Sequence, residues 1–164
     1  MFYPSIVVLL DCCAVVVFTG VYRPRGGRKS WEGMIMANVE HARFMEAAVQ
    51  GAIECALWLG MRMADDEESE SVDLRSEDVP ADVEDGIRAD VVDFVLGNTP
   101  DCVAYAEGLS AADIGHDFML TRNSHGAGFW DRGLGELGDR LTAAAKVYGE
   151  QMVVVGSDGV LSLI

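Results

Sequence analysis

Positive charge is scarce in this chain of 164 residues. Lysine and arginine together number 12, against 27 aspartates and glutamates, so the formal net charge is −15 at pH 7. Because affinity for nucleic acid depends mainly on neutralising phosphates with lysine and arginine, direct nucleic-acid binding is not expected. An acidic surface can still bind a basic partner, including the DNA-binding groove of another protein. Half of the residues are hydrophobic, which is enough for the core of a single domain.

Several motifs that carry chemistry are also missing. The chain has four cysteines: Cys12, Cys13, Cys55 and Cys102. They form no Cys-x-x-Cys pair and lie at no ligand spacing from a histidine, which argues against a zinc site or a disulfide framework. There is no Gly-Lys-Ser/Thr phosphate loop and no nucleophile elbow. The glycines of residues 133–138 match the dinucleotide string, but no convincing strand precedes them. We therefore expect neither a metal nor a cofactor.

The first 35 residues differ from the rest. Residues 2–22 are strongly apolar, and basic residues follow them, as in a weak signal anchor. Asp11, near the middle of this stretch, would be costly in a bilayer. Alternatively, translation starts at Met36, because the Trp-Glu-Gly codons of residues 31–33 contain the ribosome-binding sequence GGAGG when glutamate is encoded by GAG. On that hypothesis residues 1–35 are a non-native leader from a mis-assigned start, and 36–164 form a single acidic domain without a membrane anchor.

Hydrophobic periodicity predicts an α+β fold with three to four helices and a C-terminal β-hairpin. A helix capped by Asn38 is predicted to run to about Met63, followed by an acidic loop near 65–76. Ser76 is predicted to start the next helix, which ends near residue 97. A short helix is then expected over residues 99–107.

The C-terminal half is predicted with the same signals. The capping box Ser110-x-x-Asp113 favours a helix over 114–122, although alternation of polar and apolar residues leaves a strand as the alternative. A short extra strand is also expected near Phe129. Leucines and alanines recur at helical spacing over 134–148. Two strands, 152–155 and 160–163, flank a Gly-Ser-Asp-Gly turn and make the hairpin.

Residues 115–140, GHDFMLTRNSHGAGFWDRGLGELGDR, hold two of the three histidines, three arginines, four acids and six glycines. One interpretation is a structural platform, in which the Phe-Trp pair anchors a glycine-rich loop on the core. A binding surface on this loop would comprise Arg122, Asn123, His125, Phe129, Trp130, Asp131 and Arg132. If the protein is an enzyme, His116, His125 and Asp131 would supply the acid–base or metal-binding groups of a small hydrolase.

This motif, with the Val-rich strand and Gly-x-Asp-Gly turn behind it, resembles a family of small uncharacterised proteins encoded by phages, prophages and plasmids. The resemblance covers about residues 49–160 and is tight over 115–149. Met119 stands where the family usually has an aromatic residue, and Ser124 where it often has glycine. The resemblance implies an accessory protein of a mobile element and brings no catalytic residues with it.

The expected function is therefore non-enzymatic binding of a macromolecule, most simply another protein, in the host cytoplasm. The surface would be the 122–132 loop or the acidic face of residues 65–90. One alternative is the small hydrolase that uses His116, His125 and Asp131. The other is an acidic DNA mimic that inhibits a restriction or CRISPR system. The sequence does not indicate an oligomeric state.

Overall fold

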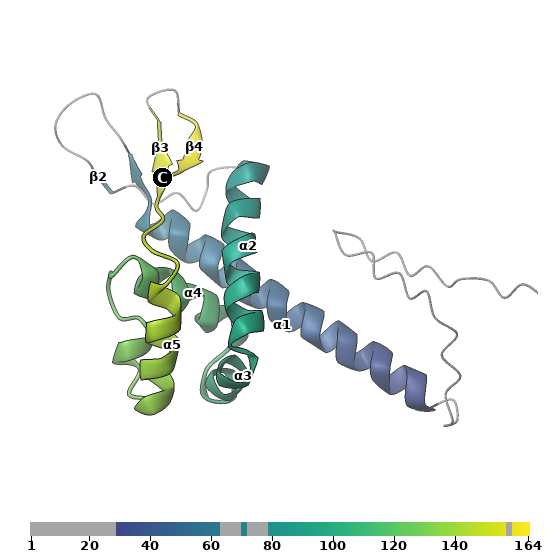
Figure 1. The fold of residues 1–164 in the computed structure, drawn as a ribbon. Helices are drawn as coiled ribbons and strands as arrows, with labels where there is room; N and C mark the ends of the chain where they lie inside the picture. Colours follow the sequence, from purple (N-terminus) through teal and green to yellow (C-terminus); the bar gives the residue numbers. More distant parts are fainter. Residues whose placement is uncertain (1–28, 63–69, 72–78, 157–158) are drawn as a thin grey trace, which may run out of the picture. The chain divides into compact units, whose positions relative to one another are not determined.

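The computed structural model describes residues 29–62, 70–71, 79–156 and 159–164 (Figure 1). The chain divides into two compact units, Met1–Met36 and Ala37–Ile164. The hydrophobic core and the candidate site lie in the second unit. In the part of the chain that the structure describes, no helix combines the length and the apolar character needed to cross a membrane.

The described elements confirm the α+β fold with a C-terminal hairpin. Their order is α1 (Lys29–Leu59), β1 (Met61–Arg62), β2 (Glu70–Ser71), α2 (Ala81–Gly97), α3 (Thr99–Gly108), α4 (Ala111–Arg122), the 3-10 helix η1 (Phe129–Asp131), α5 (Glu136–Lys146), β3 (Val153–Val155) and β4 (Leu161–Leu163). The described residues include five α-helices, one in each of the five segments that carry helical signals, with 114–122 forming a helix and not a strand.

Several predicted boundaries need correction. Asn38 lies inside α1, which begins at Lys29 and ends at Leu59 because Gly60 and the strand β1 follow. The acidic loop near 65–76 falls largely outside the described residues, and Glu70–Ser71 within it form β2. The predicted helix start at Ser76 also lies outside them; α2 itself begins at Ala81, after Pro80.

The choice between helix and strand over 114–122 is settled in favour of helix α4. Its first turn carries the predicted capping box, in which Ser110 Oγ accepts from the backbone N–H of Asp113 and the Asp113 carboxylate accepts from the backbone N–H of Ser110. The strand predicted near Phe129 is wrong. The backbone N–H of Asp131 donates to the carbonyl of Gly128 at 3.0 Å, which closes the 3-10 turn η1 instead.

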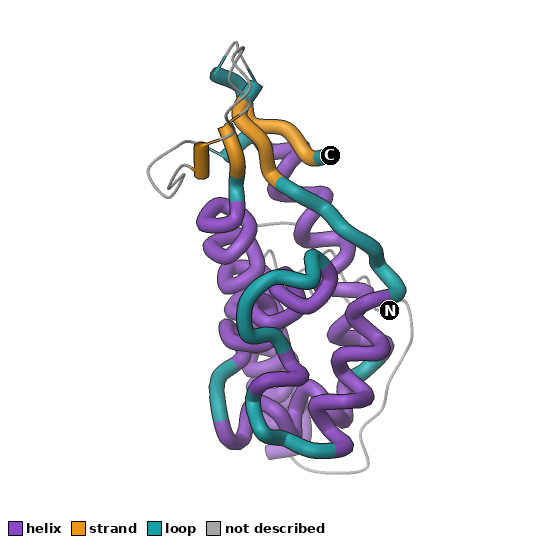
Figure 2. Tube along the Cα trace, turned by 90° about the vertical axis from the view of Figure 1, so that its left-hand side faces the viewer, coloured by secondary structure: helices purple, strands orange, loops and turns teal. Residues whose placement is uncertain are grey.

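The four short strands form one sheet in the order β2-β1-β3-β4. β1 runs parallel to β3, and the other two pairings are antiparallel. Figure 2 shows the strands gathered at one end of the helices. The last strand of the hairpin also reaches helix α2, where a methyl group of Leu163 lies against the bare Cα of Gly86.

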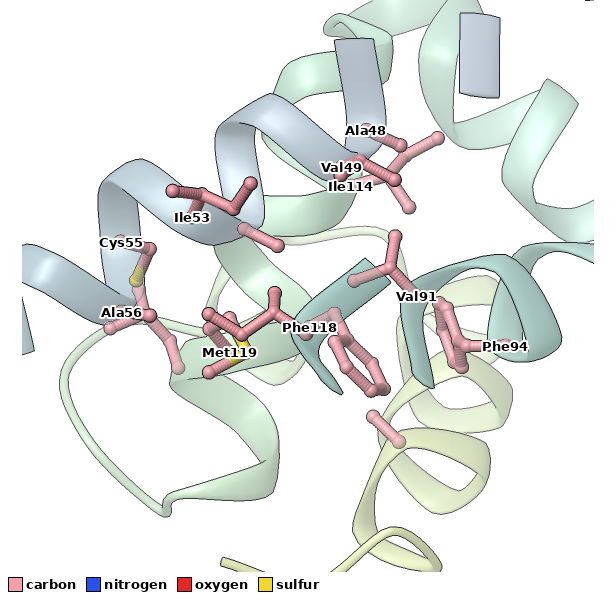
Figure 3. Packing of buried hydrophobic residues seen from close by; sticks show 14 of the residues in the cluster. Ala48, Val49, Ile53, Cys55, Ala56, Val91, Phe94, Ile114, Phe118 and Met119 are labelled. Carbon is pink, nitrogen blue, oxygen red and sulfur yellow. The ribbon is translucent and has the colours of Figure 1, made fainter. Parts of the chain in front are cut away.

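The core lies where helices α1, α2 and α4 meet, and Figure 3 shows its apolar side chains. Phe94 of α2 is central, with its ring centroid 4.7 Å from that of Phe118 and 5.7 Å from that of Phe129. The rings of Phe94, Phe118 and Phe129 are fully buried, and their burial supplies much of the apolar area that stabilises the fold.

Helices α1 and α4 cross in backbone contact at two glycines. A Cβ on Gly115 would lie 1.7 Å from the carbonyl oxygen of Ala48, and a Cβ on Gly51 would lie 2.0 Å from that of Ala112. At these two positions only the Cα hydrogen atoms of a glycine fit between the helices. The packing of these two helices therefore depends on glycine at both positions.

Candidate functional site

The segment between α4 and α5 is anchored by the first residue of η1. The backbone N–H of Phe129 donates to Thr121 Oγ1 at 3.1 Å, and the buried Phe129 ring packs edge-on against Tyr105 with centroids 5.3 Å apart. Gly138 of α5 lets that helix approach the Phe129 carbonyl, since a Cβ there would lie 2.8 Å from its oxygen. The segment is therefore fixed to three helices, as the platform interpretation predicts.

Trp130 is the exposed member of the aromatic pair. A Cβ on Gly128 would lie 2.5 Å from the Trp130 ring, so the indole lies directly over this glycine. The ring nonetheless remains 42% exposed. Glycine at position 128 thus leaves room for a large aromatic side chain to pack on the loop backbone at the surface.

A buried carboxylate binds Arg132, the residue that follows η1. Asp117 on α4 is completely buried and accepts from Arg132 Nε at 2.6 Å and from Arg132 Nη2 at 2.5 Å. The hydroxyl of Tyr105 donates to its Oδ2, and His116 Nδ1 lies 3.4 Å from its Oδ1. We call these four residues the Asp117 cluster. The two-pronged contact with Arg132 is the strong geometry for an ion pair.

The charges of the Asp117 cluster are set by burial and hydrogen bonding. Burial favours the neutral carboxyl group, but hydrogen bonds from Arg132, His116 and Tyr105 outweigh it and lower the pKa of Asp117. Burial, followed by the bond to the carboxylate, raises the pKa of Tyr105. The cluster therefore holds an ionised Asp117 and a protonated Tyr105 at neutral pH.

His116 is the titrating member of the cluster. The hydrogen bond to Asp117, with a smaller contribution from the Cys55 sulfur, raises the pKa of His116 to about 10. Because the folded value lies above the usual value of 6.5, the imidazolium stabilises the fold fully below about pH 6.5, and this contribution is lost as the pH rises through about 10. Its size is about 1 kcal/mol or less, since solvent screens a side chain that is 43% exposed.

We expect the unfolding free energy of the variant His116→Gln to fall less than that of wild type as the pH rises. Glutamine keeps a donor but carries no charge, so the difference in unfolding free energy between wild type and variant should shrink from pH 6 to pH 10 in urea titrations. His125→Gln is the matched control and should follow the wild-type profile. A constant difference across the pH range would contradict the assignment.

The three residues of the hydrolase alternative are not brought together. His116 contacts Asp117, whereas His125 Nδ1 lies 2.9 Å from the carbonyl oxygen of Asn123 and Asp131 is exposed on η1. Across the described residues, no three histidine, cysteine, aspartate or glutamate side chains are grouped so that they could hold a metal ion. The geometry that this alternative requires is not found there.

The predicted binding surface also needs correction at three positions. Arg122, Asn123 and Phe129 are buried and face the protein interior, so a partner cannot reach them. Arg122 Nη1 donates to Asp90 at 2.8 Å, and its Nε donates to the carbonyl of Gly149 at 2.8 Å. The amide of Asn123 exchanges hydrogen bonds with the backbone of Gln151. These two residues secure the C-terminal segment, whereas His125, Trp130, Asp131 and Arg132 remain at the surface.

A hollow beside Trp130 completes the exposed part of the site. It is lined by Ser124, Trp130, Thr142 and Lys146. Thr142 Oγ1 is buried and has no hydrogen-bond partner among the described residues. Thr142 and Lys146 were not among the predicted site residues, because their positions in sequence are those of ordinary helix residues. Nor was Tyr105, whose only signal is a hydroxyl on the apolar side of a helix.

Comparison with known proteins gives no further assignment: no protein-family model, no curated protein and no solved structure matches the chain. What the site can do is therefore inferred from its own residues.

Proposed function

We propose that the protein binds another protein through the surface around η1, without catalysing a reaction. Tryptophan is one of the side chains enriched at the energetic centres of protein interfaces. The observation that carries the proposal is the pairing of a buried Phe129 with an exposed Trp130 on a loop fastened by the Asp117 cluster. Such a surface is preorganised before a partner arrives.

The resemblance to proteins of phages, prophages and plasmids extends this proposal. An accessory protein of a mobile element would act in the host cytoplasm, by binding a protein of the host or of the element. The acidic composition supports a protein partner over direct contact with nucleic acid.

Neither alternative gains comparable support. The hydrolase requires a convergence of His116, His125 and Asp131 that the described residues do not provide. A DNA mimic needs a row of free carboxylates, but the described acids include several already held by arginine or tyrosine. These are Glu46, Glu84, Asp90, Asp93, Asp101 and Asp117.

The variant Trp130→Ala is expected to lose the partner while keeping the fold. Loss of an interface tryptophan typically costs 2 kcal/mol or more, which is about thirtyfold in affinity. The test is affinity capture from host lysate, with quantification of each protein retained by wild type and variant. Trp58→Ala is the matched control, because Trp58 is an exposed tryptophan on α1. Equal capture by wild type and Trp130→Ala would contradict the proposal.

A further inference from the structure

We propose that the hollow beside Trp130 receives a segment of the partner protein that presents one carboxylate flanked by apolar side chains. This inference rests on the proposed function and specifies the chemistry of the partner. Its basis is three of the groups that line the hollow: an ammonium without an ion pair and a hydroxyl without a hydrogen-bond partner among the described residues, and an exposed tryptophan.

The first group is the ammonium of Lys146. Four arginines of the domain are held in ion pairs: Arg88, Arg122, Arg132 and Arg140. Lys146 has no ion pair among the described residues, and it is exposed at the end of α5. In a chain with more than twice as many acids as bases, an unpaired cation at the edge of a hollow is a directional attraction for one anionic group.

The second group is the hydroxyl of Thr142. Its Oγ1 is buried and has no hydrogen-bond partner in the part of the chain that the structure describes, although an unpaired buried hydroxyl is unfavourable. It lies one helical turn before Lys146, so both groups are on the same side of α5. A carboxylate in the hollow would pair with the ammonium, and rotation of the Thr142 side chain, whose Oγ1 is closed to solvent in the free protein, would let the hydroxyl donate to it. None of the four lining residues is acidic, so the hollow itself contributes no competing anion.

The third group is the Trp130 ring, which forms the apolar part of the hollow. Its position over Gly128 is fixed, and Val147, the neighbour of Lys146 in sequence, is 83% exposed. An apolar side chain beside the carboxylate would pack on such a surface. Because the net charge of the chain is −15, a polyanion would be repelled at long range. The matching ligand is thus a lone acid among apolar residues and not an acidic tract.

The test uses labelled synthetic peptides with blocked ends and a Leu-Glu-Leu centre. Matched peptides carry Gln or Lys in place of Glu, and a hexaglutamate peptide and single-stranded oligothymidine serve as polyanions. Fluorescence anisotropy measures binding to the full-length protein. We expect the Leu-Glu-Leu peptide to bind at least tenfold more tightly than every other probe. A Leu-Gln-Leu, Leu-Lys-Leu or polyanion probe that binds equally well would overturn the inference.

Three variants locate the binding. Lys146→Glu should weaken the Leu-Glu-Leu peptide at least tenfold, whereas Arg43→Glu changes the net charge equally at a distant exposed residue of α1 and should leave binding unchanged. Thr142→Val should weaken binding about two- to tenfold, the range of one hydrogen bond. It should not lower the melting temperature, because it removes an unpaired buried hydroxyl.

If Lys146→Glu and Thr142→Val both bind the Leu-Glu-Leu peptide as tightly as wild type, the inference is wrong. Its failure remains distinguishable from failure of the proposed function. If lysate capture depends on Trp130 but no acidic peptide binds the hollow, the surface is correct and the ligand chemistry is wrong. If capture is independent of Trp130, the proposed surface fails as well.

Discussion

Replacing Gly115 by alanine is expected to remove most or all of the stability of the folded domain. The added Cβ would lie 1.7 Å from the carbonyl oxygen of Ala48 and 2.7 Å from the backbone nitrogen of Ala52. Both are backbone atoms of α1, so no side-chain rotation relieves the contact and the two helices must separate. Overpacking of a core commonly costs 1–3 kcal/mol, and a forced separation of packed helices should exceed that, at about 4 kcal/mol or more.

Urea denaturation followed by circular dichroism measures the effect. Gly97→Ala is the matched control, because a Cβ at the end of α2 meets nothing within 4 Å and alanine is the better helix former. Gly51→Ala should resemble Gly115→Ala, and the double variant should cost less than the sum, since the first substitution already opens the same crossing. A Gly115→Ala protein as stable as Gly97→Ala would show that the crossing is not as close as described.

The second large effect is expected from Asp117→Ala. This substitution leaves the guanidinium of Arg132 and the buried hydroxyl of Tyr105 without their acceptor. Removing one partner of a buried pair usually costs 3–5 kcal/mol. Because the Arg132 side chain is still 32% exposed and can regain water, we expect about 3 kcal/mol.

Asp101→Ala provides the control for this variant. Asp101 accepts from Arg140 through two hydrogen bonds of 2.8 and 2.9 Å. It therefore repeats the forked geometry at the surface, where such a pair contributes about 1 kcal/mol at most.

The lowered pKa of Asp117 adds a second measurement, the pH dependence of stability. Its stabilisation is present above the ordinary pKa of 3.8 and is lost as the pH falls through the lower folded value. The difference between wild type and Asp117→Ala should therefore shrink in acid. Equal losses of unfolding free energy from Asp117→Ala and Asp101→Ala would show that the buried Asp117–Arg132 pair does not stabilise the fold more than a surface pair.

Local signals predicted the parts of the fold that depend on neighbours in sequence. The capping box at Ser110 fixed the start of α4, and the turn residues between two Val- and Leu-rich runs located the hairpin. Hairpin pairing and helix caps involve residues a few positions apart, so composition and spacing are sufficient for them. The two-residue strands β1 and β2 are too short to show a period, and they were not anticipated.

The site was predicted only in outline, because burial of its polar residues depends on distant partners. Arg122 was placed on the surface, but its interior position is determined by Asp90, 32 residues earlier, and by Gln151, 29 residues later. No local pattern distinguishes an arginine that meets such partners from one that faces water. The backbone of Ser124 has a φ of 54°, in the left-handed region, where a glycine would be unstrained.

The pairing of β1 with β3 has a consequence for how the domain assembles during synthesis. Met61 lies beside Val154, so the two chain segments that meet there are separated by nearly the whole domain. Closing so long a loop is entropically unfavourable and slow. On the ribosome, the helices can collapse as they emerge, but β1 must wait without its parallel neighbour until residues 153–155 have left the exit tunnel. Completion of the sheet is thus a late step in assembly, and an interrupted chain would present an open strand edge to other proteins.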